Sequence, residues 1–120
     1  MPHPRDTDRE DDMGWTSHVP PHWDDDTRKL LEIATHFLHS VFGHTPVRAS
    51  GLMRDFLRLG PFADEDMVHH EGPYSIAAVC HYRLVLQGPP QGLVTWLVDN
   101  GHHSPPPEVF SYINAHYFQH

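Results

Sequence analysis

The sequence contains little cysteine, little lysine and no long apolar run. Cys80 is the one cysteine in 120 residues, which excludes an internal disulfide and any zinc site built on several thiolates. No apolar stretch approaches the ~18 residues of a membrane-spanning helix, and no basic segment precedes an apolar one as in a secretory signal. We therefore expect a cytoplasmic protein with no membrane contact and room for one domain, since domains span ~50 to 250 residues.

Basic residues are also scarce, with 8 Lys and Arg against 16 Asp and Glu and a formal net charge of −8 when His is neutral. A chain of this charge, with Lys29 as its single lysine, is a poor binder of nucleic acid at neutral pH. The negative charge is concentrated at the start, because residues 1–26 carry −6 of it. The rest of the chain is close to neutral.

Residues 1–23 have the composition of an acidic flexible arm, and residues 24–120 that of one helical domain. The arm has few large apolar side chains to offset the entropy lost on ordering. Trp15 and Trp23 are its candidates for partner binding, because tryptophan concentrates binding energy in a small contact. Alternatively, both rings fold back and cover the core of the domain, since small domains need every apolar side chain.

From residue 24 onward, caps and apolar spacing predict a series of short helices. Asp24 to Asp26 offer N-cap oxygens and first-turn charge to a helix that Gly43 ends. Thr45-Pro46 has the residues of a cap and first turn for a second helix, which ends at Gly60-Pro61. A short turn with acidic residues at its start is predicted at 64–68, and a further helix is predicted to begin at Ser104-Pro105.

Residues 73–87 fit either a strand or a helix. Strict alternation of apolar residues suits a β-hairpin over 74–98, whereas a segment that is apolar on all sides suits a buried helix. An isolated two-stranded ribbon is marginally stable, and no other segment resembles a third strand. We therefore predict an all-α compact bundle of five or six short helices. An α+β fold with a hairpin at 74–98 is the alternative.

The chain has 13 histidines, and one set of them has a spacing that suits a metal. Glu32, His36 and His39 are spaced i, i+4 and i+7, so they project from one side of a helix. Two histidines and one carboxylate are a metal-binding combination for zinc or iron. The same positions also form an ordinary solvated helix face. We expect no cofactor, with zinc or another divalent transition metal as the alternative.

Two other roles for histidine follow from the sequence. His81 lies in an apolar segment and is the candidate for a buried general acid or base, whereas its neighbour Cys80 is expected to be a core residue. No Gly-rich phosphate loop or nucleophile elbow is present, so no catalytic residue is assigned. Protonation of all 13 histidines would change the net charge from −8 to +5, which makes a pH-sensitive interface a second hypothesis.

Residues 93–101, with the sequence LVTWLVDNG, resemble the BH2 segment of Bcl-2-type apoptosis regulators. In that segment a tryptophan precedes a helix end with an acidic residue, Asn and Gly. Residues 52–55 (LMRD) are similar to the lead-in to the BH1 segment, although the Asn-Trp-Gly-Arg string of BH1 is absent. The resemblance implies a helical protein-interaction module.

Together these features predict a non-enzymatic protein–protein interaction module that acts as a small adaptor, inhibitor or antagonist. The alternative is a small His-dependent metal-binding protein or enzyme. The expected partner is a protein, and self-association is left open. Trp15 and Trp23 would contact a basic or apolar-grooved surface, and Arg54 and Arg58, on one helical ridge, would contact an acidic one.

Overall fold

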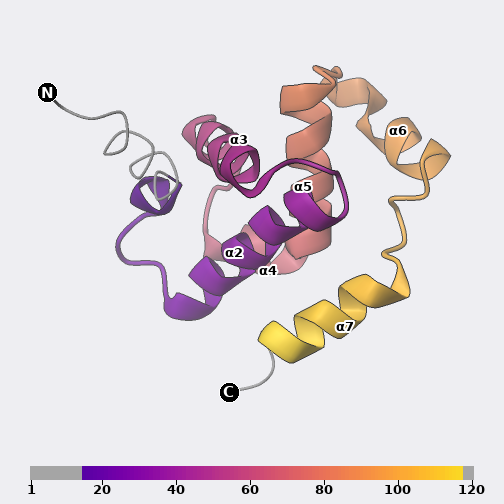
Figure 1. Cartoon of the computed structure of the whole chain (residues 1–120). Helices are drawn as coiled ribbons and strands as arrows, with labels where there is room; N and C mark the ends of the chain where they lie inside the picture. The colour runs from indigo at the N-terminus through magenta and orange to yellow at the C-terminus, as the bar shows by residue number, and fades with distance from the viewer. Residues whose placement is uncertain (1–14, 118–120) are drawn as a thin grey trace, which may run out of the picture.

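The computed structural model describes residues 15–117, and within that range it contains helices and no strand. The elements are η1 (Thr16–His18), α2 (Asp25–Ser40), α3 (Pro46–Arg58), α4 (Glu65–Glu71), α5 (Pro73–Cys80), η2 (His81–Val85), η3 (Pro90–Gly92), α6 (Leu93–Asp99) and α7 (Pro107–His116) (Figure 1). The all-α prediction is confirmed, and the hairpin alternative at 74–98 is wrong. None of the described helices is long and apolar enough to cross a membrane.

α2 begins and ends at the signals that the sequence contains. The side chain of Asp24 accepts a hydrogen bond from the Thr27 backbone N–H at 3.0 Å, which makes it the N-cap. At the other end, Gly43 has a φ of +81°, a conformation that favours glycine, and its N–H bonds the His39 carbonyl at 3.1 Å. Between these ends, six apolar side chains are buried: Leu30, Leu31, Ile33, Ala34, Phe37 and Leu38.

α5 lies at the centre of the molecule, and α2 packs against it more extensively than any other two described elements pack together (Figure 1). In its sequence, PYSIAAVC, the polar groups are the hydroxyls of Tyr74 and Ser75, so contact with water is unfavourable on nearly every side of the helix. Ala77 and Ala78 are fully buried, and their small side chains let neighbouring helices approach closely. α3 and α4 also contact α5.

α3 begins at its predicted cap, and α4 begins at a cap within the segment 64–68 that was predicted as a short acidic turn. The Thr45 hydroxyl accepts from the Arg48 N–H at 3.2 Å, with Pro46 as the first helical residue. The Asp64 carboxylate accepts from the Met67 N–H at 3.2 Å at the start of α4. These local hydrogen bonds determine where the two helices that flank α5 begin.

α5 continues into the π-helical turn η2, which the sequence did not indicate. The Leu86 N–H bonds the His81 carbonyl at 3.2 Å, and the Gly88 N–H bonds the Tyr82 carbonyl at 3.0 Å. Gln87 follows with a φ of +54°, the only positive φ among the described non-glycine residues. The wider turn rotates the side chains of 81–85 relative to a regular α-helix, and such turns are frequent at functional sites.

α6 and α7 lie at the outside of the bundle (Figure 1). α6 has no fully buried residue, and α7 has one, Val109. α7 begins at Pro107, three residues after the Ser104 start predicted from the sequence. A residue before a proline is restricted to extended conformations, so a helix in the run Pro105-Pro106-Pro107 can begin only at the last proline.

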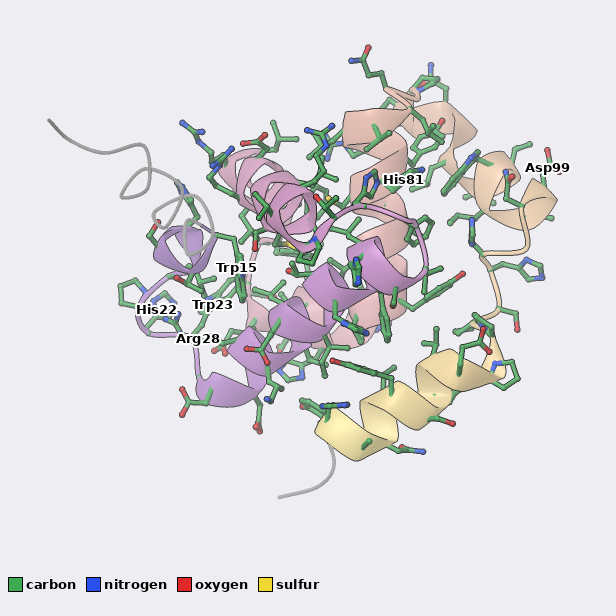
Figure 2. The ribbon with its side chains drawn as sticks, viewed as in Figure 1. Trp15, His22, Trp23, Arg28, His81 and Asp99 are labelled. Carbon is green, nitrogen blue, oxygen red and sulfur yellow. The ribbon has the colours of Figure 1, made fainter. Side chains whose placement is uncertain are left out.

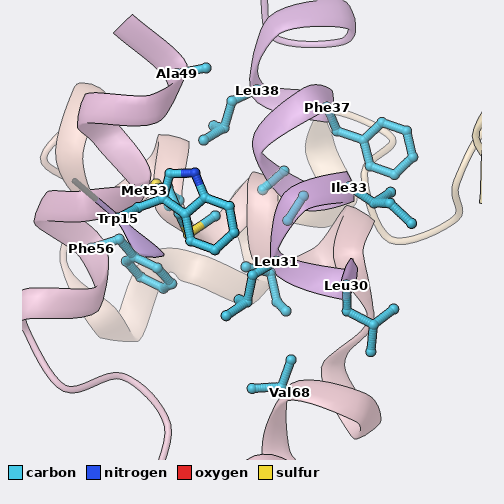
Figure 3. Close-up of a cluster of buried hydrophobic side chains, with 14 of the residues drawn as sticks. Trp15, Leu30, Leu31, Ile33, Phe37, Leu38, Ala49, Met53, Phe56 and Val68 are labelled. Atoms are coloured by element: carbon cyan, nitrogen blue, oxygen red, sulfur yellow. The ribbon is translucent and has the colours of Figure 1, made fainter. Parts of the chain in front are cut away.

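Residues 15–23 pack against the helices that follow them in the chain. Trp15, Val19 and Trp23 are buried, and the Trp15 ring lies between α2 and α3 (Figure 3). Within the predicted arm of 1–23, three large apolar side chains at intervals of four residues thus leave water together. Residues 1–14 lie outside the described residues.

The fully buried Thr27 hydroxyl joins the start of α2 to α4. Its Oγ1 atom lies 2.6 Å from Glu65 Oε2, 3.1 Å from Asp24 Oδ1 and 3.0 Å from His69 Nε2. The Asp24 backbone N–H also donates to Glu65 Oε2, at 2.9 Å. Hydrogen bonds from the backbone and hydroxyl of Thr27 lower the pKa of Asp24, so its carboxylate stays charged in this network.

We expect Thr27→Val to lower the free energy of unfolding by about 1–3 kcal/mol, because it keeps the shape of the side chain and removes buried hydrogen bonds. Thr35→Val is the matched control: the Thr35 hydroxyl bonds only the Leu31 carbonyl of its own helix, at 2.8 Å, so its loss should cost less than about 1 kcal/mol. Urea unfolding of both variants measures the difference. Equal losses would contradict a specific role for the Thr27 network.

Candidate functional site

The two tryptophans predicted to bind a partner are core residues. Trp15 is 7% exposed and Trp23 is 9% exposed, and both belong to the buried apolar cluster of the domain. Figure 2 shows them on the side where residues 15–23 pack against α2. Their rings stabilise the fold, which is the alternative that the sequence left open.

Arg54 and Arg58 lie on one ridge of α3 as predicted, but they share a carboxylate. Asp55 Oδ1 is 3.2 Å from Arg54 Nε and 3.8 Å from Arg58 Nη1. The Arg58 side chain is 60% exposed, so its ion pair is screened by water and contributes little to stability. The ridge is a charged surface whose positive charge Asp55 partly neutralises.

Glu32, His36 and His39 line one wall of an open pocket of about 520 Å³ with Trp15 and Tyr112, but they do not converge on a metal position. The His36 ring stacks on Tyr112 with 4.1 Å between centroids, His39 Nδ1 lies 2.7 Å from the His44 carbonyl oxygen, and Glu32 pairs with Lys29. Each candidate ligand is thus engaged elsewhere. Among residues 15–117, no group of three His, Cys, Asp or Glu side chains is arranged to hold a metal ion.

Cys80 and His81 occupy different environments although they are neighbours. Burial raises the pKa of the Cys80 thiol to about 12, so it remains protonated and is a poor nucleophile. His81 is half-buried, and its Nδ1 atom lies 3.0 Å from His44 Nε2. Burial also lowers the pKa of His81, which makes the neutral ring the dominant form at pH 7.

Sequence reasoning missed that Thr27, His69 and Glu65 meet. A hydroxyl beside an imidazole and a carboxylate is the arrangement of an activated nucleophile. Here, however, Thr27 has no exposed surface, so a substrate cannot reach its hydroxyl. The arrangement therefore links two helices and has no catalytic use in this conformation.

A second pocket, which we call the α5 groove, has a mainly apolar lining. It has a volume of about 170 Å³, and its lining comes from α3, α4, α5, η2, α6 and the loop after α3: Phe56, Pro61, Phe62, Met67, Glu71, Ile76, Val79, Arg83 and Leu93. A cavity of about 150 Å³ can hold a benzene ring. The α5 groove thus has room for one large apolar side chain.

The floor of the α5 groove is rigid and its rim is exposed. Phe56 and Ile76 are buried, and the Phe62 ring packs edge-on against Phe56 with 6.0 Å between centroids. Met67 is 39% exposed, and its sulfur accepts the Ala63 N–H at 3.1 Å. A flexible methionine on the rim of a rigid apolar floor suits binding of an apolar side chain.

Opposite charges lie toward the two ends of the α5 groove. Ile76, Val79 and Arg83 are spaced i, i+3 and i+7 along α5 and η2, so they follow one side of this segment for about 10 Å. Arg83 is exposed and has no ion pair within the described part of the chain. Near the start of α5, the Glu71 carboxylate accepts the Ser75 hydroxyl at 2.9 Å.

Tyr82 holds the loop that joins η2 to α6. Its hydroxyl donates to the Pro89 carbonyl at 2.7 Å, and its ring fills the space beside Gly88 and Gly92. A Cβ atom at Gly88 would overlap the ring, and one at Gly92 would lie 2.8 Å from the hydroxyl oxygen. The two glycines therefore let the loop close over Tyr82 and bring Leu93 to the α5 groove.

Comparisons with protein-family models, with curated proteins and with solved structures find no match to this chain. The segment that resembles BH2 forms α6, with Asn100 as its C-cap and Gly101 at a φ of +75°. The helix end implied by the resemblance is therefore present. Its tryptophan, Trp96, faces the body of the domain and contacts Tyr82, with 5.1 Å between ring centroids.

Alanine substitution at two glycines tests the packing of this loop. We expect Gly88→Ala to lower the free energy of unfolding by about 1–3 kcal/mol, because the buried Tyr82 ring must move. Gly51→Ala should raise it by about 0.5–1 kcal/mol, because Gly51 lies inside α3 with only Arg54 Nη2 near its Cβ position, at 3.8 Å. Thermal unfolding distinguishes the two, and a stabilised Gly88→Ala variant would contradict the description of the loop.

Proposed function

We propose that this chain is a non-enzymatic protein–protein interaction module that binds a short amphipathic helix of a partner protein in the α5 groove. The observation that carries the proposal is the combination of an apolar pocket for one large side chain with Arg83 on its rim, a cation that forms no ion pair with any residue of 15–117. Binding of an amphipathic helix in an apolar groove is a recurrent mode of peptide recognition.

The lining of the α5 groove defines the chemistry of the bound helix. A leucine- or phenylalanine-sized side chain would fill the pocket between Phe62, Val79 and Leu93, where it gives up most of its contact with water. An acidic residue near one end would pair with Arg83, and a basic residue about two turns away would lie near Glu71. Such opposite charges would fix the direction of the helix.

The proposed module would act as an adaptor, inhibitor or antagonist by occupying a helix that the partner uses elsewhere. We place this activity in the cytoplasm, which suits a chain whose single cysteine is free and buried. The exposed valines of α6, Val94 and Val98, are four residues apart on one face, so self-association through them is a second contact that gel filtration can test.

Selection from a displayed library of helical peptides, with the full chain as bait, tests this proposal. We expect selected peptides to share one large apolar anchor and an acidic residue. Arg83→Glu and Met67→Glu should each weaken their binding about tenfold or more, measured by fluorescence anisotropy. The matched controls are Arg58→Glu and Val47→Glu, which change exposed residues outside the α5 groove and should stay within about twofold.

Charge reversal on the peptide gives the sharper comparison. A peptide whose acidic residue is changed to lysine should bind Arg83→Glu better than it binds the original chain, because the ion pair is restored in the opposite sense. Circular dichroism checks that every variant is folded. The proposal would be overturned if the selected peptides shared no apolar anchor, or if the control variants weakened binding as much as the groove variants.

A further inference from the structure

A cluster of seven rings joins α6 to the rest of the domain, and three of the rings are imidazoles. We call it the histidine–aromatic cluster; it consists of Phe42, His44, Tyr74, His81, Tyr82, Trp96 and His102. These residues come from the segment after α2, from α5 and η2, from α6 and from the segment after α6. The cluster thus brings together side chains from parts of the sequence far apart.

α6 depends on this cluster because none of its residues is fully buried. Its half-buried tryptophan, Trp96, has ring centroids 5.0 Å from His102, 5.1 Å from Tyr82 and 6.2 Å from His81. Two of these three neighbours are imidazoles, which gain a positive charge when the pH falls. The position of α6 is therefore sensitive to the charge of imidazoles.

The contact between His44 and His81 requires at least one neutral ring. Their facing nitrogens, Nε2 of His44 and Nδ1 of His81, are 3.0 Å apart. A hydrogen bond at this distance needs one N–H and one lone pair. If both rings are protonated, two N–H groups face each other and the contact becomes repulsive.

His102 is held in a similar way on the other side of Phe42. The Tyr74 hydroxyl lies 2.7 Å from His102 Nδ1, and a phenol that donates here needs a neutral acceptor nitrogen. The Phe42 ring packs against both imidazoles, with centroids 4.9 Å from His81 and 5.1 Å from His102. Protonation of both histidines would place two positive charges, which repel each other, against the same half-buried ring.

Among residues 15–117, no carboxylate forms an ion pair with the three imidazoles of the histidine–aromatic cluster; the acid that acts on another member of the cluster is Glu108 of α7, which acts on Tyr74. Arg48 of α3 acts on His44 and adds to the positive charge, and the imidazoles act on one another. Asp99, the acidic residue of α6, forms no ion pair with them and lies on the outer side of α6, away from His81 (Figure 2). Tyr74 of α5 is a further titratable neighbour, and burial together with the negative charge of Glu108 raises its pKa, so it stays neutral.

The direction of the pH effect follows from burial. Burial lowers the pKa of His44, His81 and His102 below the value of about 6.5 that the ring has in water. The arrangement in which these rings are buried therefore keeps its full stability above about pH 6.5, and it loses stability as the pH falls from about 6.5 to the lowered pKa values. Acid favours an arrangement in which these rings are exposed to water.

We propose that α6 is an acid-sensitive latch on the α5 groove: protonation of His44, His81 and His102 releases Trp96, and Leu93 then leaves the wall of the groove. Leu93 is the first residue of α6 and lines the α5 groove. A shift of α6 therefore removes one wall of the pocket that would hold the anchor side chain. Only the consequence for binding rests on the proposed function. The movement of α6 stands on the histidine–aromatic cluster itself.

The latch can be followed by NMR in the full chain without any ligand. Incorporation of 5-fluorotryptophan gives one fluorine signal for each of the three tryptophans, and 13C-methyl labelling of methionine adds Met67 in the α5 groove and Met53 in the core. Trp96→Phe and Met67→Leu assign the two reporters. As the pH falls from 7.5 to 5.0, the signals of Trp96 and Met67 should move together, while those of Trp15, Trp23 and Met53 should not.

Variants identify the responsible histidines. The double variant His44→Gln/His81→Gln keeps neutral hydrogen-bonding groups and should lose most of the pH response, whereas His103→Gln, at an exposed neighbour of His102, should keep it. The core signals report whether each variant is folded. A constant Trp96 signal, movement of Trp96 without Met67, movement of all three tryptophans together, or an unchanged response in the double variant would each overturn the proposal.

A peptide that binds the α5 groove should also bind about fivefold or more weakly at pH 5.0 than at pH 7.5, a size typical of coupling between sites. The NMR measurement needs no peptide. A chain that binds no helix but shows the coupled movement would overturn the proposed function and leave the latch standing. A chain that binds a helix equally at both pH values, without movement, would overturn the latch alone.

Discussion

The burial of α5 on nearly every side is the constraint on which the rest of the structure depends. A helix with the sequence PYSIAAVC has no face suited to water, so other elements must surround it. α2 provides the largest contact, α3 and α4 flank it, and Trp15 closes the gap between α2 and α3 (Figure 3). A chain of this size has few apolar residues to spare, which explains why Trp15 and Trp23 are in the core.

The same central segment also builds both features that we connect with function. Ile76, Val79 and Arg83 form one wall of the α5 groove, while His81 and Tyr82 enter the histidine–aromatic cluster. The π-helical turn at 81–85 directs the side chains of the α5 groove and those of the histidine–aromatic cluster to different sides of the segment. The segment 73–85 thus supports both the binding surface and the contacts that hold α6 beside that surface. Of α5 and α6, α6 is the helix that is held less strongly.

Local signals in the sequence were enough to predict most helices, because a cap acts over three or four residues. Asp24, Thr45 and Asp64 each cap the helix that follows them. The contact of Thr27 with Glu65 and His69 spans about 40 residues, and no local pattern indicates it. The α5 groove also needs tertiary structure, since its lining runs from Phe56 to Leu93. Once 73–87 is taken as a helix, however, the spacing of Ile76, Val79 and Arg83 is a signal that could have identified one wall.

Contacts between residues far apart in the sequence also decide where the side chains of the predicted metal-binding set lie. One side of α2 does carry Glu32, His36 and His39, as their spacing requires. However, Tyr112 of α7 stacks on His36, and the carbonyl of His44, in the segment after α2, lies against His39.

The central claim is that the burial of α5 organises the rest of the fold. Hydrogen exchange at pH 7.5, resolved along the full chain, tests this claim most directly. The amides of α5 should exchange most slowly, and those of α6 and α7 about tenfold or more faster. Equal protection of α5 and α6 would contradict the account.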